Sequence, residues 1–272
     1  MQYRYDHFSK DRIKGDAGFD GGPEAGEKFP ETDLETIGGE RIRLEDLAGR
    51  PTLITLGSYT CPMTAAAGPI LKRLHEEFGG AVAFVTVYVR EAYPGEHYPQ
   101  PAGFERKLEH ARAYAARDDI PWTVAVDDLD GTLHRALGAR PNSAYVVDGE
   151  GRVMFRAPWS NDERTLRGAL EAAAGGEWPE SGSRNRLVPL LSGLGEMYHT
   201  LELAGDQAKA DVRREALPTY AAARLARLFR GLPPVARGAS GAASLLVGAA
   251  SLLVGALGLG AAGVALARRA TR

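Results

Sequence analysis

The chain has 272 residues, a net charge of −2 and an apolar content of 44%, as expected for a globular protein with one ordinary domain and some additional sequence. The small net charge gives no reason to expect a nucleic-acid partner. A single cysteine excludes both an intrachain disulfide framework and a redox centre of two cysteines within the chain. The six histidines are scattered and no phosphate-binding glycine loop is present, so we expect no metal and no cofactor.

The first residues, 1–25, are polar, charged and rich in glycine, and they predict an extended lead-in. They contain no apolar core of the kind that a signal peptide needs. We therefore expect the main domain to be cytoplasmic.

Residues 26–175 alternate between short β-type runs and helical segments. An edge strand is expected around Ile42 and Leu44, and a buried strand over residues 52–56 precedes a helix over residues 65–78. The pattern continues with strands (81–89 and 122–126), helices (104–117 and 132–137), a hairpin (143–147 and 153–156) and a closing helix (162–174). This order predicts an α/β protein with a thioredoxin-like fold, a central mixed sheet flanked by helices. Ligands of such sheets bind at the C-terminal ends of the central strands.

Beyond residue 175 the composition changes. Residues 176–238 predict a helical linker region with apolar-striped helices over 187–203 and 208–229, the second interrupted by Pro218. The second helix is basic, and a solvated face is a commoner reason for such charge than contact with lipid. Its arginines are Arg213, Arg214, Arg224, Arg227 and Arg230.

Residues 239–267 carry no charged side chain and are followed by a basic tail, 268–272. At about 1.5 Å per residue, a helix of this length exceeds the roughly 30 Å thickness of the bilayer core. The sequence therefore predicts a C-terminal transmembrane helix and a single-pass membrane anchor; a flexible tail rich in glycine and alanine is the alternative. Ser244 and Gly248 have the spacing at which membrane helices approach closely, which suggests a homodimer.

The only cysteine, Cys61, lies between the turn at Gly57-Ser58 and Pro62, where the strand 52–56 passes into a helix. The first turn of a helix offers free N–H groups and the positive end of the helix dipole, and both favour a thiolate. Pro62 suits the first helical position because its missing N–H costs nothing there. A buried structural cysteine is the alternative interpretation.

Two motifs carry a resemblance to a known family. The segment Gly57-Ser-Tyr-Thr-Cys-Pro62, followed by Val87-Tyr-Val-Arg-Glu-Ala-Tyr-Pro94, resembles the iodothyronine deiodinase family of the thioredoxin-like (redoxin) superfamily. The similarity covers about residues 26–175. The resemblance implies that Cys61 takes the place of the catalytic selenium, with Ser58 and Thr60 beside it, and that Glu91 is the active-site glutamate.

The chain also departs from the family pattern. Tyr93 stands where the family has a histidine, and the family's second histidine has no clear counterpart, because Pro101 lies near that position. A phenol, with an unperturbed pKa near 10, donates a proton only weakly at neutral pH. We therefore do not expect iodothyronines to be substrates.

The remaining expectation is thiol chemistry at Cys61, with Glu91 positioning or deprotonating the thiol and Ser58 and Thr60 binding the thiolate or the substrate. Because no second cysteine is available, an external thiol of the glutathione or thioredoxin type would reduce the enzyme.

Three further residues are candidates for substrate binding. Tyr93 and His97 follow Glu91 in the same loop, and Pro141 lies near where thioredoxin folds keep a cis-proline facing the cysteine.

Two alternatives stay open. A one-cysteine peroxidase of the peroxiredoxin type would keep Ser58 three residues before the cysteine, but it would have proline where Ile54 stands. The other alternative is a non-catalytic, membrane-tethered binding module with the same fold.

Overall fold

The computed structural model describes residues 3–11, 21–43, 46, 49–180 and 187–247. A seven-stranded sheet with the order β2-β1-β5-β4-β3-β6-β7 forms its centre. The strands are β1 (Asp33–Thr36), β2 (Arg41–Arg43), β3 (Thr52–Gly57), β4 (Ala83–Tyr88), β5 (Thr123–Val126), β6 (Ala144–Val147) and β7 (Val153–Ala157). Strands β3, β4 and β5 are parallel, whereas β6 and β1 run antiparallel to their neighbours β3 and β5. The predicted α/β architecture with a central mixed sheet is therefore confirmed.

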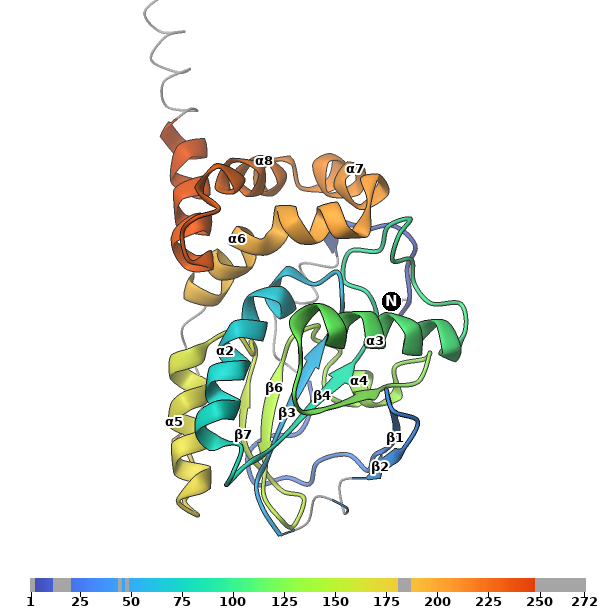
Figure 1. Cartoon of the computed structure of the whole chain (residues 1–272), viewed down its shortest axis with the longest axis vertical. Helices are drawn as coiled ribbons and strands as arrows, with labels where there is room; N and C mark the ends of the chain where they lie inside the picture. Colours follow the sequence, from blue (N-terminus) through green and yellow to red (C-terminus); the bar gives the residue numbers. More distant parts are fainter. Residues whose placement is uncertain (1–2, 12–20, 44–45, 47–48, 181–186, 248–272) are drawn as a thin grey trace, which may run out of the picture.

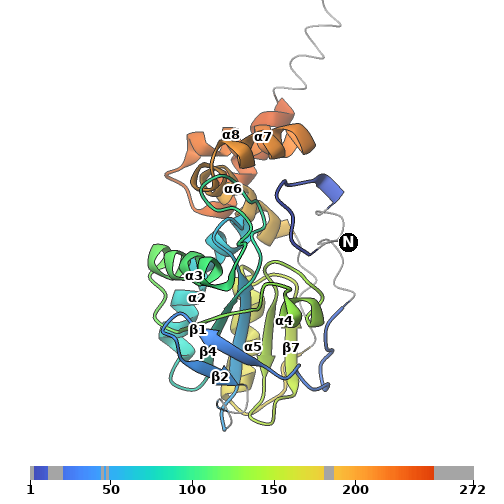
Figure 2. The same ribbon diagram turned by 90° about the vertical axis from the view of Figure 1, so that its right-hand side faces the viewer.

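Helices cover both faces of this sheet. Helices α2 (Pro62–Phe78), α3 (Phe104–Asp118) and α5 (Glu163–Ala174) pack on one face, and the short α4 (Thr132–Ala136) lies on the other (Figures 1 and 2). Successive strand residues point to opposite faces, so Leu53 packs with α2 whereas Ile54 packs with α4. Burial of both faces explains why β3 and β4 are almost continuously apolar.

A second group of helices lies beyond the C-terminal ends of the central strands (Figure 1). It comprises α6 (Leu187–Ala204), α7 (Asp206–Glu215), α8 (Leu217–Ala226) and the 3₁₀ turn η2 (Arg227–Phe229). The segment predicted as one helix over 208–229 is two helices, because Ala216 is extended with a φ of −143° and Pro218 lies in the first turn of α8. Proline is tolerated there, where no intrahelical N–H bond is lost.

Helix α6 crosses the N-terminal end of α2. At the crossing, Gly193 of α6 faces Met63 of α2, and a Cβ atom on Gly193 would lie only 2.1 Å from the Met63 sulfur. The absence of a side chain at Gly193 therefore permits this close approach. The crossing brings α6 over the loop that carries Cys61.

The predicted transmembrane helix over 239–267 was wrong, and so was the single-pass C-terminal membrane anchor. Within the described residues, no helix combines the length and the apolar character needed to cross a bilayer. Residues 248–272, which hold most of that prediction and the basic tail, lie outside the described part. The described helical residues 234–247 instead pack on protein: a Cβ on Gly238 would lie 1.9 Å from the Leu191 oxygen in α6, and one on Gly241 would lie 2.4 Å from the Ala222 oxygen in α8.

Candidate active site

Cys61 lies where β3 passes into α2. The strand ends at Gly57, residues 58–60 turn, and Cys61 occupies the N-cap position, in front of Pro62 in the first helical turn. The Cys61 N–H donates to the Ser58 carbonyl (3.3 Å), and the Cys61 carbonyl accepts from the Ala65 N–H (3.0 Å). The thiol therefore lies at the positive end of a helix of 17 residues, a position that favours the thiolate.

Close packing fixes this strand-to-helix junction. A Cβ on Gly57 would lie 2.9 Å from the Thr64 methyl group, so only glycine allows β3 and α2 to approach so closely. The Asn142 side-chain amide donates to the Leu56 carbonyl (3.4 Å) and to the Thr64 hydroxyl (3.3 Å). The loop before β6 thus holds both elements together.

The Glu91 carboxylate, which is 0% exposed, binds the residue next to Cys61. Its Oε2 accepts from the Thr60 N–H (3.0 Å) and from the Thr60 hydroxyl (2.7 Å), and its Oε1 accepts a short bond from the Tyr88 hydroxyl. The Gln100 side chain binds the Glu91 backbone N–H and carbonyl in turn. This network ties the end of β4 to the cysteine loop.

The charge of Glu91 affects its buried neighbours. Burial, the negative charge of Glu91 and the hydrogen bond to it together raise the pKa of Tyr88 well above its usual value, so Tyr88 stays a donor. His110 of α3 is also buried, with Nδ1 3.4 Å from Glu91 Oε1. Neither ring nitrogen of His110 has a hydrogen-bond partner among the described residues.

The Thr60 hydroxyl also accepts from the Tyr93 N–H (3.1 Å), which brings the start of the 92–101 loop to the cysteine. The Tyr93 ring packs on Phe8 of the N-terminal segment, residues 3–11, with 4.7 Å between ring centroids. Ser58 is fully buried, and its hydroxyl has no hydrogen-bond partner within the described residues.

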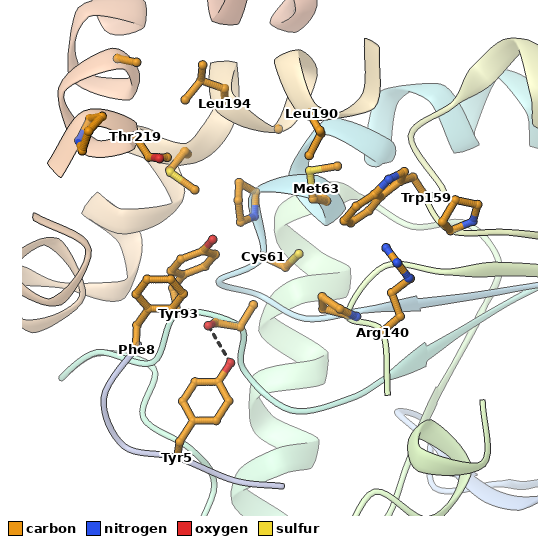
Figure 3. A pocket seen from close by; sticks show the side chains of 18 residues that line it. Tyr5, Phe8, Cys61, Met63, Tyr93, Arg140, Trp159, Leu190, Leu194 and Thr219 are labelled. Carbon is orange, nitrogen blue, oxygen red and sulfur yellow. Dashed lines mark hydrogen bonds between the residues drawn. The ribbon is translucent and has the colours of Figure 1, made fainter. Parts of the chain in front are cut away.

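A cavity of about 590 Å³ opens beside Cys61. The side chains around it come from the N-terminal segment, the 92–93 turn, the 140–141 and 158–159 loops, and helices α6 and α8 (Figure 3). They include Phe8, Tyr93, Arg140, Trp159, Leu194 and Thr219. Cys61 is only 1% exposed, so the thiol is reached through this cavity.

The structure gathers some of the predicted site residues and separates others. Cys61, Tyr93 and Pro141 line the cavity, and all described peptide bonds, including the one before Pro141, are trans. Ser58, Thr60 and Glu91 lie next to the cysteine loop but do not line the cavity. His97 points elsewhere, because its Nδ1 contacts the Leu203 carbonyl (3.2 Å) at the end of α6.

Sequence reasoning missed His110 and Arg140. His110 shares a helix face with Lys107, Ala111 and Tyr114, and this spacing of three and four residues signals a buried face. Arg140 follows Gly138 and Ala139, both in the left-handed region with φ of 84° and 55°. No pattern in the sequence indicates that this turn faces Cys61.

Within the described residues, no group of three or more histidine, cysteine, aspartate or glutamate side chains could hold a metal ion.

Comparison with known proteins gives one family match. The sequence model of the family described as iodothyronine deiodinase matches residues 19–174, more than half of the chain.

Individual relatives agree with this match. Thyroxine 5-deiodinase from Gallus gallus is 28% identical over 135 residues, which are 45% of this chain and 51% of that protein. Type II iodothyronine deiodinase from Mus musculus is 32% identical over 168 residues, 55% of this chain and 62% of that protein. The thiol:disulfide interchange protein DsbE from Pseudomonas aeruginosa is 26% identical over 150 residues, 53% of this chain and 72% of that protein. The chain thus spans about half the length of the chicken protein.

Proposed function

The chain belongs to the iodothyronine deiodinase family, and on that basis we propose that it is a thiol-dependent oxidoreductase in which Cys61 is the nucleophile. The observation that carries the proposal is the position of the thiol: Cys61 lies at the N-terminus of α2 and lines a cavity of about 590 Å³. A helix N-terminus stabilises the thiolate, which is the reactive form. The cavity beside the thiolate is large enough to hold an organic substrate.

The proposed reaction reduces its substrate by two electrons. The Cys61 thiolate attacks an electrophilic atom X of a substrate X–Y; the S–X bond forms, the X–Y bond breaks, and Y leaves with the electron pair and takes up a proton. An external thiol then displaces HX and forms a mixed disulfide with Cys61. A second external thiol releases Cys61 and leaves as a disulfide. The substrates to be considered are a peroxide, a small disulfide and a polarised carbon–halogen compound.

The described residues have distinct parts in this proposal. Glu91 acts as a positioning residue, because its carboxylate binds Thr60 and not the cavity. Tyr93 supplies a wall of the cavity, with its ring held against Phe8. A phenol is a weak proton donor at neutral pH, so we propose that iodothyronines are not turned over. The external thiol is of the glutathione or thioredoxin type.

Trapping of the covalent intermediate tests this proposal. The reduced full-length protein is incubated with cumene hydroperoxide, a small aromatic disulfide or an iodinated phenol, and the adduct at Cys61 is identified by mass spectrometry. We expect an adduct with at least one reagent and none in Cys61→Ser. A thiol pKa at or above the ordinary value of about 8.5, together with no adduct from any reagent, would exclude the enzyme and favour a non-catalytic binding module.

A further inference from the structure

The thiol of Cys61 lies beneath a cap of helices. Helices α6, α7 and α8, which we call the cap, lie beyond the C-terminal ends of the central strands (Figure 1). Leu194 of α6 and Thr219 of α8 line the cavity together with Cys61 (Figure 3). Cys61 itself is 1% exposed. A molecule that reacts with the thiol must therefore enter the space beneath the cap.

The start of α6 is fixed to the rest of the fold. In the loop between β7 and α5, the side-chain amide of Asn161 donates to the Pro189 carbonyl of α6 (2.9 Å), and both residues are buried. One turn further along α6, Gly193 packs on Met63 of α2 so closely that a Cβ would lie 2.1 Å from the Met63 sulfur. The packing leaves no slack at this end of the cap.

The end of α6 is held by the loop that follows β4. In this loop the His97 N–H donates to the Ala204 carbonyl, the last residue of α6 (3.1 Å). The Glu96 carboxylate accepts from the N–H groups of Asp206 and Gln207, the latter at 2.9 Å, at the N-terminus of α7. A carboxylate at this position is also attracted by the helix dipole. The cap is therefore attached at both ends of α6.

The N-terminal segment closes a further side of the cavity. Tyr5 and Phe8 line it (Figure 3). The Tyr5 hydroxyl donates to the Ala92 carbonyl in the loop after β4 (2.9 Å), and the Phe8 N–H donates to the Asp211 carboxylate of α7 (3.2 Å). The segment thus joins the cap to the loop after β4 and restricts the approach to Cys61.

This cover places a demand on the thiol that regenerates Cys61. Such a thiol must attack the Cys61 sulfur itself and form a mixed disulfide with it. A cysteine in a folded protein brings its surrounding chain with it, whereas a volume of about 590 Å³ lies in the range of small-molecule sites, roughly 300–1,000 Å³. A low-molecular-weight thiol fits this space. A protein thiol reaches Cys61 only when the cap or the N-terminal segment opens.

We propose that the reductant of Cys61 is a low-molecular-weight thiol and that the cap excludes thioredoxin-type proteins from the reaction. The assignment rests on the proposed function, from which it takes the reduction of Cys61 by an external thiol. The first thiol molecule bonds to the Cys61 sulfur, the S–X bond breaks, and HX leaves. A second molecule of the same thiol attacks the first one's sulfur, Cys61 leaves as the thiolate, and a small disulfide forms. Two thiols are thus oxidised to one disulfide while X–Y is reduced to HX and HY.

A pyridyl disulfide at Cys61 tests this selection by size. The reduced full-length protein is treated with 2,2'-dithiodipyridine, an uncharged aromatic reagent small enough for the cavity. Release of thiopyridone from the adduct is then followed by absorbance with mercaptoethanol, glutathione or reduced thioredoxin as the attacking thiol. The reference is Glu109→Cys in a Cys61→Ser background, because residue 109 is an exposed position of α3 and carries the same adduct.

The ratio of two rate constants, that of thioredoxin over that of mercaptoethanol, removes the difference in reactivity between the two adducts. We expect this ratio to be about a hundredfold or more lower at Cys61 than at position 109, because thioredoxin reaches Cys61 only in the small fraction of molecules whose cover is open. We expect glutathione to behave as mercaptoethanol does. The pyridyl disulfide of N-acetylcysteine is a second reference, which does not depend on the folding of a variant.

Three results would overturn the inference: the same ratio at both positions, release from Cys61 by thioredoxin but by neither small thiol, or no adduct at Cys61. The first two leave the proposed function standing with a protein as the reductant, whereas the third contradicts both proposals. If the small thiols regenerate Cys61 but no peroxide, small disulfide or halogen compound causes thiol consumption, the proposed function fails and the selection by size stands.

Discussion

The Glu91 carboxylate is a buried acceptor for three donors around the cysteine loop: the Thr60 N–H, the Thr60 hydroxyl and the Tyr88 hydroxyl. Glu91→Ala leaves all three without this acceptor, and each buried donor left unpaired costs about 1–3 kcal/mol. We expect the free energy of unfolding to fall by about 3 kcal/mol or more. Glu91→Gln keeps one acceptor oxygen, and its expected loss is about 1 kcal/mol.

Urea denaturation measures these losses, with Glu109→Gln as the control. Glu109 is exposed on α3 and pairs with Arg106 at the surface, so its change is expected to be below about 0.5 kcal/mol. Equal stabilities of Glu91→Ala and Glu109→Gln would contradict the positioning role. The pH profile of Cys61 alkylation in Glu91→Gln reports whether the loop still presents the thiol correctly.

His134 makes stability depend on pH. Burial, together with the positive charge of Arg90, lowers its pKa from 6.5 to about 3. Its Nδ1 accepts from the Tyr3 hydroxyl (2.8 Å), and its Nε2–H donates to the Arg140 carbonyl. Between pH 6.5 and 3 the unfolded chain therefore binds a proton that the folded chain does not bind.

We accordingly expect this histidine to lower the free energy of unfolding by up to about 1.4 kcal/mol per pH unit on acidification from pH 6.5 towards 3. Urea denaturation at pH 7, 6 and 5 measures the slope. The slope should flatten in His134→Gln. His97→Gln, a change at an exposed residue of the 92–101 loop, is the control. An unchanged slope in His134→Gln would show that other groups carry the dependence.

At the scale of elements, the sequence predicts best where both faces of an element are buried. Strands β3 and β4 are almost continuously apolar. Helix α5 was predicted from its cap, and Asp162 is the N-cap, with its carboxylate accepting from the Thr165 N–H. Strand β1 was not predicted, because its four residues are mostly polar and only partly buried. It pairs with its neighbour β2 and with the distant β5, and no local pattern reveals the pairing with β5.

The helical residues 234–247 show a different limit. The lack of charge over residues 239–267 suggested a lipid environment. The glycines among residues 234–247 instead serve protein packing: a Cβ on Gly241 would lie 2.4 Å from the Ala222 carbonyl oxygen of α8. Gly241→Ala is therefore expected to lower the free energy of unfolding by about 1–3 kcal/mol through overpacking. Gly231→Ala is the control, since a Cβ there would meet nothing within 4 Å. Thermal unfolding measures both, and equal melting temperatures would contradict the packing.

At the scale of the whole molecule, the cavity is built from parts that the sequence does not connect. Cys61 and the end of β3 could be recognised from local order, since strand, turn and helix start follow one another. The segments that cover the cavity could not be recognised from the sequence, because their positions depend on long-range contacts. The N-terminal segment contacts α7, and α6 contacts α2. Asp211 of α7 makes the first of these contacts: its carboxylate lies 3.0 Å from His7 Nδ1 and accepts from the Phe8 N–H (3.2 Å).

Asp211→Ala is expected to loosen the N-terminal segment, because it removes both of these bonds while α7 keeps a good helix former. Phe8 and Tyr5 would then cover Cys61 for less of the time, and alkylation of Cys61 by a bulky maleimide should accelerate. Loss of one hydrogen bond to a charged group, about 1.5 kcal/mol, corresponds to about a tenfold rise in the open population. Asp206→Ala is the control, since Asp206 is exposed and pairs with Lys209 without reaching the N-terminal segment. Urea denaturation separates this local opening from global unfolding. An unchanged alkylation rate in Asp211→Ala would mean that access to Cys61 is governed by α6 and α8 alone, and the N-terminal segment would then have no part in closing the cavity.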